Sequence, residues 1–137
     1  MTFPDQLGGF VDLLGLELVE ATGDRVVMRW RLRPELMQGY GIVHGGVYCS
    51  VVETAASVGA AVWLGERGQV VWVSNLTDFI RAARDGEMTA TALPIHRGRS
   101  QQLGAVEILD AERRLMAKGQ VRLQNIASAE ALAQPAS

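Results

Sequence analysis

Residues 38–59 read QGYGIVHGGVYCSVVETAASVG, a glycine-rich segment that leads directly into a run of small and aliphatic residues. The glycines favour a tight backbone turn, and the run that follows predicts a helix over residues 45–64, closed by Gly65 and Gly68. One carboxylate, Glu53, interrupts the apolar side chains of this helix. Burying a carboxylate is costly unless it is paired or used in chemistry. The segment therefore predicts either a functional acid or a helix face that meets solvent or another subunit.

The size and charge of the chain limit what it can be. Its 137 residues, 48% of them hydrophobic, correspond to one domain with a sizeable core. Thirteen Lys and Arg against 15 Asp and Glu give a net charge of −2, which supplies no overall electrostatic reason to expect binding to nucleic acid or a membrane surface. Cys49 is the only cysteine, and no Cys and His residues have zinc-ligand spacing. We therefore expect no disulfide within the chain and no metal.

The sequence also favours a cytoplasmic location. Residues 1–20 lack the basic start and the uninterrupted apolar run of a signal peptide. The apolar run at residues 43–65 is interrupted by His44 and Glu53, and we interpret it as a core helix and not as a membrane span. A single cysteine suits a reducing compartment.

The rest of the chain predicts mostly strands. Before the central helix we expect a short amphipathic helix over residues 4–14, and strands over residues 16–21 and 25–33. The inner face of the short helix is formed by Leu7, Phe10, Val11 and Leu14. Strand-like runs follow the central helix at residues 70–80, 87–95, 101–109 and 114–123. The short polar links between them favour antiparallel pairing.

The predicted fold class is therefore α+β, with an antiparallel sheet that curls around one long central helix. We expect a single domain over residues 1–126 and a frayed tail over residues 127–137, where Ala and Ser predominate.

The central helix places polar groups on one face. Gly46, Ser50, Glu53 and Ser57 follow one another at spacings of four, three and four residues. The helix N-terminus at Gly45 offers free backbone N–H groups to a polarised carbonyl oxygen, and the glycines let a ligand approach closely.

The groups around this helix are those needed for acyl transfer to water. Glu53 can act as a base or a nucleophile, Gln38 can donate its amide N–H to the same oxygen, and Ser57 can hold a water. Cys49, four residues before Glu53, is a rival nucleophile, but it has no paired base beyond His44 and is interpreted as an inert buried thiol.

These residues form a motif that resembles the hotdog-fold acyl-CoA thioesterases. The pattern Q-x-x-G-x-x-H-G-G, with E seven residues after the last glycine, is present at Gln38, Gly41, His44, Gly45, Gly46 and Glu53. The closest likeness is to the PaaI-like branch, which includes 4-hydroxybenzoyl-CoA and 1,4-dihydroxy-2-naphthoyl-CoA thioesterases that use Glu. The likeness covers about residues 8–125. It implies a hotdog fold and hydrolysis of an aryl or medium- to long-chain acyl-CoA to the free acid and CoA.

The resemblance also implies a role for each residue of the motif. The Gly45 N–H, assisted by the Gln38 amide, polarises the thioester carbonyl, and Glu53 attacks this carbonyl or activates water. Ser57 orients the water. His44 belongs to the motif, with a structural hydrogen bond that shapes the loop as the alternative interpretation. No cofactor is implied, because CoA is part of the substrate.

CoA carries phosphates, so a chain of this net charge needs a local basic patch. The candidates lie in two links between strands and are Arg81, Arg84, Arg97, Arg99 and Ser100, with solvated loop charges as the alternative interpretation. The resemblance further implies a homodimer with the active site at its interface, assembled into a homotetramer. Candidates to line the acyl pocket across this interface are Val73, Asn75 and Phe79.

Two other functions stay open. A hotdog-fold hydratase or dehydratase also carries an acid on the central helix, but the H-F-P pattern of the dehydratases is missing from this sequence. A non-catalytic acyl-CoA sensor would keep the fold, although a mere binder has no need of Glu53.

Overall fold

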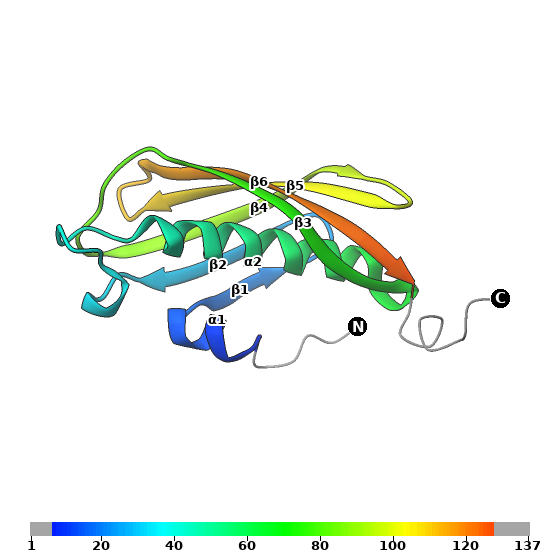
Figure 1. The fold of residues 1–137 in the computed structure, drawn as a ribbon, viewed down its shortest axis with the longest axis horizontal. Helices are drawn as coiled ribbons and strands as arrows, with labels where there is room; N and C mark the ends of the chain where they lie inside the picture. Colours follow the sequence, from blue (N-terminus) through cyan, green and yellow to red (C-terminus); the bar gives the residue numbers. More distant parts are fainter. Residues whose placement is uncertain (1–6, 128–137) are drawn as a thin grey trace.

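The long helix α2 (Gly45–Leu64) lies inside the curve of a six-stranded sheet in the computed structural model, which describes residues 7–127 (Figure 1). The strands are β1 (Glu17–Ala21), β2 (Val26–Arg31), β3 (Gly68–Phe79), β4 (Glu87–Arg97), β5 (Gln101–Asp110) and β6 (Leu115–Ala127). Their order across the sheet is β1-β2-β4-β5-β6-β3, and each neighbouring pair is antiparallel. This arrangement confirms the predicted α+β class, with an antiparallel sheet around a long central helix.

Three short helical elements complete the described residues: α1 (Gly9–Leu14), η1 (Pro34–Leu36) and η2 (Gly65–Arg67). Helix α1 ends at Gly15, which adopts a left-handed conformation with φ of 74° and donates its N–H to the Asp12 carbonyl. Of the four apolar residues expected on the inner face of this helix, only Leu14 is fully buried, and Phe10 is 57% exposed. The first residues of the predicted helix, 4–6, lie outside the described residues, as does the predicted tail beyond Ala127.

Helix α2 forms the centre of the core because small residues let the sheet approach it closely. Its buried side chains are Val47, Tyr48, Val51, Val52, Ala55, Ala56, Val58, Ala60 and Leu64. On β6, a Cβ added to Gly119 would stand only 2.6 Å from the Val52 side chain, so a side chain at this position would clash with the helix residue that packs on it. By length and composition α2 could cross a membrane, but in this fold it is the core helix that its interrupted apolar run predicts.

Strand β3 lies at one edge of the sheet and, within the described residues, pairs only with β6. Figure 1 shows β3 and β6 running side by side along the helix. Several large apolar side chains of this edge strand are exposed, namely Val71, Trp72, Val73, Leu76 and Phe79. An unpaired strand edge with exposed apolar side chains is typical of a surface that associates with another chain.

Candidate active site

His44 fixes the N-terminus of α2. It is the N-cap residue, and its Nδ1 accepts a hydrogen bond of 2.8 Å from the backbone N–H of Gly46. Because Nδ1 is the acceptor, the neutral imidazole carries its proton on Nε2. The Gly45 N–H, in contrast, has no hydrogen-bond acceptor within residues 7–127. The cap thus leaves one N–H at the positive end of the helix available to a ligand.

The loop before α2 presents the side chain of Gln38. The Gln38 N–H donates to the Ile42 carbonyl at 2.8 Å, and the Gly41 N–H donates to the Gln38 carbonyl at 2.9 Å. Glycine is required at position 41 because its φ of 76° lies in the left-handed region, which side chains disfavour. The side-chain oxygen Oε1 of Gln38 accepts a hydrogen bond from the Tyr40 N–H. The Gln38 NH₂ group donates no hydrogen bond within residues 7–127, so it is available as a donor to a ligand.

Gln38 and Gly45 line the same cavity, called here the Gln38 cavity, which has a volume of about 270 Å³. Phe79 and Arg81 also line it. The Phe79 ring covers Gly45 so closely that an added Cβ would stand 2.9 Å from the ring. The Gln38 cavity therefore brings together the two predicted carbonyl-binding groups and one predicted pocket residue from β3.

Tyr48 lies beneath Phe79, with the two ring centroids 6.3 Å apart. Its side chain is buried, and its hydroxyl has no hydrogen-bond partner in the described part of the chain. Burial raises the pKa of Tyr48 to about 12, and the negative charge of Asp110 adds to the increase. The phenol is therefore uncharged at neutral pH. The position of Tyr48 beneath Phe79 could not be predicted from the sequence, because an aromatic residue at this helical spacing is equally suited to an ordinary core.

Glu53 is half-buried on α2, and its side chain makes no hydrogen bond or ion pair with residues 7–127. Ser57, one turn further, has a buried hydroxyl that also lacks a partner among those residues. Ser50, one turn earlier, is bonded instead to the Gly46 carbonyl at 2.7 Å. Both side chains therefore lack a partner among the described residues, but the Ser57 hydroxyl is shielded from the surface of the single chain.

Gly45 and Glu53 are well separated within one chain. They lie eight residues apart on the same helix, which is about 12 Å along the helix axis at a rise of about 1.5 Å per residue. Glu53 does not line the Gln38 cavity.

The predicted phosphate-binding arginines lie at opposite ends of α2. Near its N-terminus, Arg81 lines the Gln38 cavity, while Arg84 donates to the carbonyls of Tyr40 and Gly41 at 3.4 and 3.2 Å. Arg81 makes no side-chain hydrogen bond or ion pair with the described residues. Arg84 instead supports the loop that carries Gln38.

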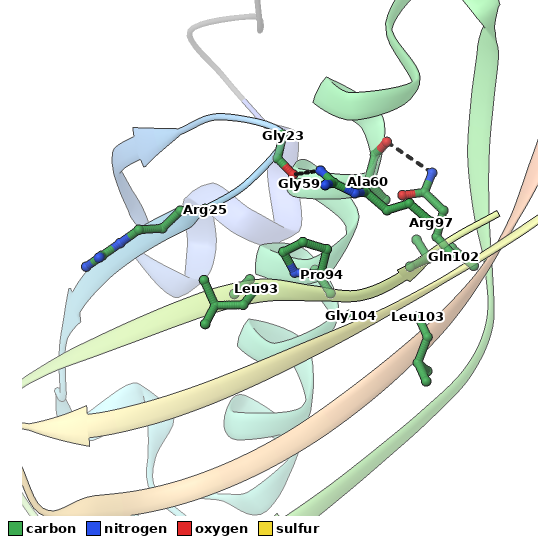
Figure 2. Close-up of a pocket in the computed structure, with 13 residues that line it drawn as sticks. Gly23, Arg25, Gly59, Ala60, Leu93, Pro94, Arg97, Gln102, Leu103 and Gly104 are labelled. Atoms are coloured by element: carbon green, nitrogen blue, oxygen red, sulfur yellow. Dashed lines mark hydrogen bonds between the residues drawn. The ribbon is translucent and has the colours of Figure 1, made fainter.

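The other arginines lie near the C-terminus of α2. Arg97 donates to the Gly23 carbonyl and to Asp24 Oδ1, both at 2.9 Å, and Figure 2 shows it reaching toward Gly23. Arg97 and Arg99 line a cavity of about 410 Å³ beside Trp63. The Ser100 carbonyl accepts a hydrogen bond from the Asn125 N–H. Helix α2 has 20 residues and is about 30 Å long, and this group lies near the opposite end of it from Arg81.

The predicted pocket residues of β3 have different surroundings. Val73 is 55% exposed. The Asn75 amide donates to the Cys49 carbonyl at 2.9 Å, and Asn75 Oδ1 accepts a hydrogen bond of 2.7 Å from the Thr77 hydroxyl. Asn75 therefore ties β3 to α2, whereas Phe79 reaches the Gln38 cavity. Cys49 is half-buried.

Comparison with known proteins identifies the family. Residues 40–117, more than half of the chain, match the family model of the Thioesterase superfamily. The chain belongs to the thioesterase superfamily. This confirms the family predicted from the Gln38–Glu53 motif, and the chain is accordingly a thioester hydrolase of the hotdog fold.

Similar proteins and structures cover about four fifths of this thioesterase or more. The crystal structure of S. sahachiroi AziG superposes with a TM-score of 0.88 at 52% identity, covering 89% of this chain and 99% of AziG. Rv1847 of Mycobacterium tuberculosis H37Rv is 49% identical over 116 residues, covering 82% of this chain and 83% of the relative. A 1,4-dihydroxy-2-naphthoyl-CoA hydrolase of Listeria monocytogenes is 30% identical over 108 residues, covering 79% of this chain and 88% of the relative.

The described residues contain no cluster of His, Cys, Asp and Glu that could hold a metal ion.

Proposed function

We propose that this thioesterase hydrolyses an acyl-CoA to the free acid and CoA. The observation that carries the proposal is the Gly45 N–H, left free at the helix N-terminus in the same cavity as the Gln38 amide. Two N–H donors that line one cavity at a positive helix end suit the oxygen of a thioester carbonyl, on which negative charge develops during the reaction. The similarity to a relative named as a CoA thioester hydrolase supports CoA as the thiol.

In this mechanism the Glu53 carboxylate removes a proton from a water held by Ser57, and the water oxygen attacks the carbonyl carbon. The carbonyl oxygen becomes an oxyanion bound by the Gly45 N–H and the Gln38 NH₂. Collapse of this intermediate breaks the C–S bond and releases CoA as a thiolate, which leaves readily because a thiolate is a weak base. In the covalent variant, Glu53 itself attacks, and water then hydrolyses the resulting anhydride.

Arg81 and Arg99 are the proposed ligands of the CoA phosphates, and for one CoA they come from two copies of the chain, because within one copy they lie near opposite ends of α2. Both guanidinium groups are without hydrogen-bond or ion-pair partners in residues 7–127, whereas those of Arg84 and Arg97 are engaged with backbone carbonyls. Arg81 is also exposed beside the cavity that receives the thioester. The reaction needs no cofactor, because CoA is part of the substrate.

We propose that the chain forms a homodimer through the free edge of β3, and that two dimers assemble into a homotetramer. The exposed apolar side chains of β3, Val73 among them, support the dimer. The separation of about 12 Å between Gly45 and Glu53 along one helix supports a site completed at the interface between two copies. The single free cysteine suits the reducing cytoplasm, which we propose as the location.

The test is release of free thiol from a panel of aryl- and fatty acyl-CoAs by the purified native chain, followed with a thiol reagent. The proposal predicts multiple turnovers of at least one thioester. Binding of acyl-CoAs without thiol release would contradict it and identify an acyl-CoA sensor. Addition of water to an enoyl-CoA with the thioester left intact would contradict it in favour of a hydratase.

A further inference from the structure

The loop that joins β4 to β5, residues 98–100, is held against β6 by Asn125. The Nδ2 atom of Asn125 donates to the Gly98 carbonyl at 3.0 Å and to the Arg99 carbonyl at 3.1 Å. The backbone N–H of Asn125 donates to the Ser100 carbonyl at 2.8 Å. Three successive carbonyls of the loop therefore face one residue of β6.

These bonds fix the direction of the N–H groups in the loop. The C=O and the N–H of a trans peptide point in opposite directions, and the peptide bonds of the loop are trans. Because the Gly98 and Arg99 carbonyls face Asn125, the N–H groups of Arg99 and Ser100 point away from it. Neither N–H has an acceptor within residues 7–127. Two successive free N–H groups on one side of a loop are suited to bind an anion.

A buried glutamine fixes the orientation of the Asn125 side chain. Gln102 of β5 is 3% exposed, and its Nε2 donates to Asn125 Oδ1 at 2.8 Å and to the Ala60 carbonyl of α2 at 3.2 Å. Figure 2 shows the bond between Gln102 and Ala60. Since Oδ1 of Asn125 is the acceptor in this contact, its NH₂ group has to face the loop. The loop is therefore held in shape by buried contacts before a ligand arrives.

The surroundings of the loop are positively charged. Arg67, Arg97 and Arg99 line the cavity of about 410 Å³ beside Trp63, and none of the described residues that line it is an Asp or Glu. Arg97 is paired at 2.9 Å with Asp24, which does not line the cavity, whereas the Arg99 guanidinium has no partner within residues 7–127. A phosphate at the loop is thus attracted by Arg99 and repelled by no carboxylate of the lining.

We infer that Asn125 is a positioning residue for substrate binding, because by holding the Gly98 and Arg99 carbonyls it presents the backbone N–H groups of Arg99 and Ser100 to a phosphate of CoA. This inference rests on the proposed hydrolysis of acyl-CoA, and it adds two backbone donors to the proposed role of the Arg99 guanidinium. Asn125 does not itself contact the phosphate. It acts through the shape of the loop.

The test measures kcat and KM for the acyl-CoA that the native chain hydrolyses best and for the corresponding acyl-pantetheine, which has no phosphate. Asn125→Leu removes the two bonds that Nδ2 donates and adds no charge. It should raise KM for the acyl-CoA by about tenfold, with kcat and the KM for the acyl-pantetheine unchanged. A purely structural role of Asn125 would affect both substrates alike. The matched control is Gln124→Leu, since the half-buried Gln124 side chain bonds to no carbonyl of residues 98–100.

Two further variants separate the groups of the loop. Asn125→Asp keeps an acceptor for Gln102 but places a carboxylate oxygen where the donor was, and it should raise KM for the acyl-CoA even more than Asn125→Leu does. Ser100→Ala keeps the backbone N–H and should leave this KM nearly unchanged. An unchanged KM in both Asn125 variants would overturn the inference, and so would equal increases for the two substrates. An increase in Ser100→Ala as large as that in Asn125→Leu would also overturn it, in favour of the hydroxyl.

The thioester of dephospho-CoA, which lacks the 3′-phosphate, identifies the phosphate. If its KM stays the same in Asn125→Leu, the loop binds the 3′-phosphate, and if its KM rises as for the acyl-CoA, the loop binds the diphosphate. Both results support the inference. If the native chain hydrolyses no thioester, the proposed function fails, and titration calorimetry with CoA itself tests the loop separately. The Kd of CoA should then be about tenfold higher for Asn125→Leu than for the native chain, and an equal Kd would overturn the inference.

Discussion

The aromatic ring of Phe79 lies against the backbone of Gly45, so that a Cβ on this glycine would stand 2.9 Å from the Cζ atom of Phe79. Gly45→Ala should therefore displace an exposed ring and place a methyl group where the thioester approaches the helix N-terminus. We expect kcat/KM to fall by about a hundredfold, comparable to the loss of an oxyanion donor. Steady-state kinetics and thermal unfolding check this, with unfolding expected to change little because the ring can rotate toward solvent.

Two variants accompany this measurement. Gly39→Ala in the same loop adds a methyl group that meets nothing within 4 Å, and it should leave kcat/KM unchanged. Gly45→Ala combined with Phe79→Ala should restore part of the activity if ring displacement contributes to the loss. Full activity of Gly45→Ala would show that the carbonyl does not bind at this N–H.

Ser57→Ala removes a buried hydroxyl that has no partner in the described part of the chain, so no hydrogen bond of the folded chain is lost. The melting temperature should stay the same, while kcat should fall by roughly ten- to a hundredfold if the hydroxyl positions the hydrolytic water. Thr89→Ala is the control, because Thr89 lies half-buried on β4 and its side chain makes no hydrogen bond with the described residues. A loss larger than that of Glu53→Gln would show that the two residues have exchanged roles.

Substitution of Arg84 and of Arg81 should have different effects on substrates with and without the CoA phosphates. Arg84 holds the Tyr40 and Gly41 carbonyls of the loop that carries Gln38, so Arg84→Ala should lower kcat by a similar factor with acyl-CoA and with acyl-pantetheine, which lacks the nucleotide. Arg81→Ala should raise KM for acyl-CoA alone. An Arg84→Ala effect confined to acyl-CoA would instead make Arg84 a phosphate ligand.

The edge of β3 should control assembly. Trp72 and Leu76 are 62% and 68% exposed, and replacing either with Lys places a charge in the proposed interface. We expect these variants to sediment as smaller species than the native protein in analytical ultracentrifugation, with reduced activity. Ile95→Lys on β4 is the control for a new surface charge. A native monomer with full activity would exclude the shared site.

Local patterns predicted the elements of this fold well, because each is encoded by neighbouring residues. The helix over residues 45–64 has the predicted bounds, since its glycines and apolar run mark both ends. The strands are where the alternating and apolar runs lie, within a few residues. Local patterns could not predict the strand order. Strand β3 follows α2 in the chain but pairs with β6 at the edge of the sheet, and no local pattern encodes that pairing.

The same limit applies to the candidate site: contacts within the local motif could be predicted, and long-range contacts could not. The motif places Gln38 and Gly45 in one cavity, as their proposed common target requires. Long-range bonds engage other predicted residues, such as Arg97 with Gly23 and Asn75 with Cys49, and spacing along the chain cannot reveal them. The exposure of Phe10 was unexpected because an amphipathic pattern shows which residues share a face but not what that face covers.

The central claim is that the Glu53 carboxylate carries the reaction, and Glu53→Gln tests it most directly because the amide keeps the shape of the side chain and removes its basicity. The measurement is kcat/KM for thiol release from the best acyl-CoA of the panel, beside Glu107→Gln as an exposed control on β5. We expect a loss of at least about 10³-fold in Glu53→Gln, with substrate binding retained. A Glu53→Gln chain as active as the native one would contradict the account.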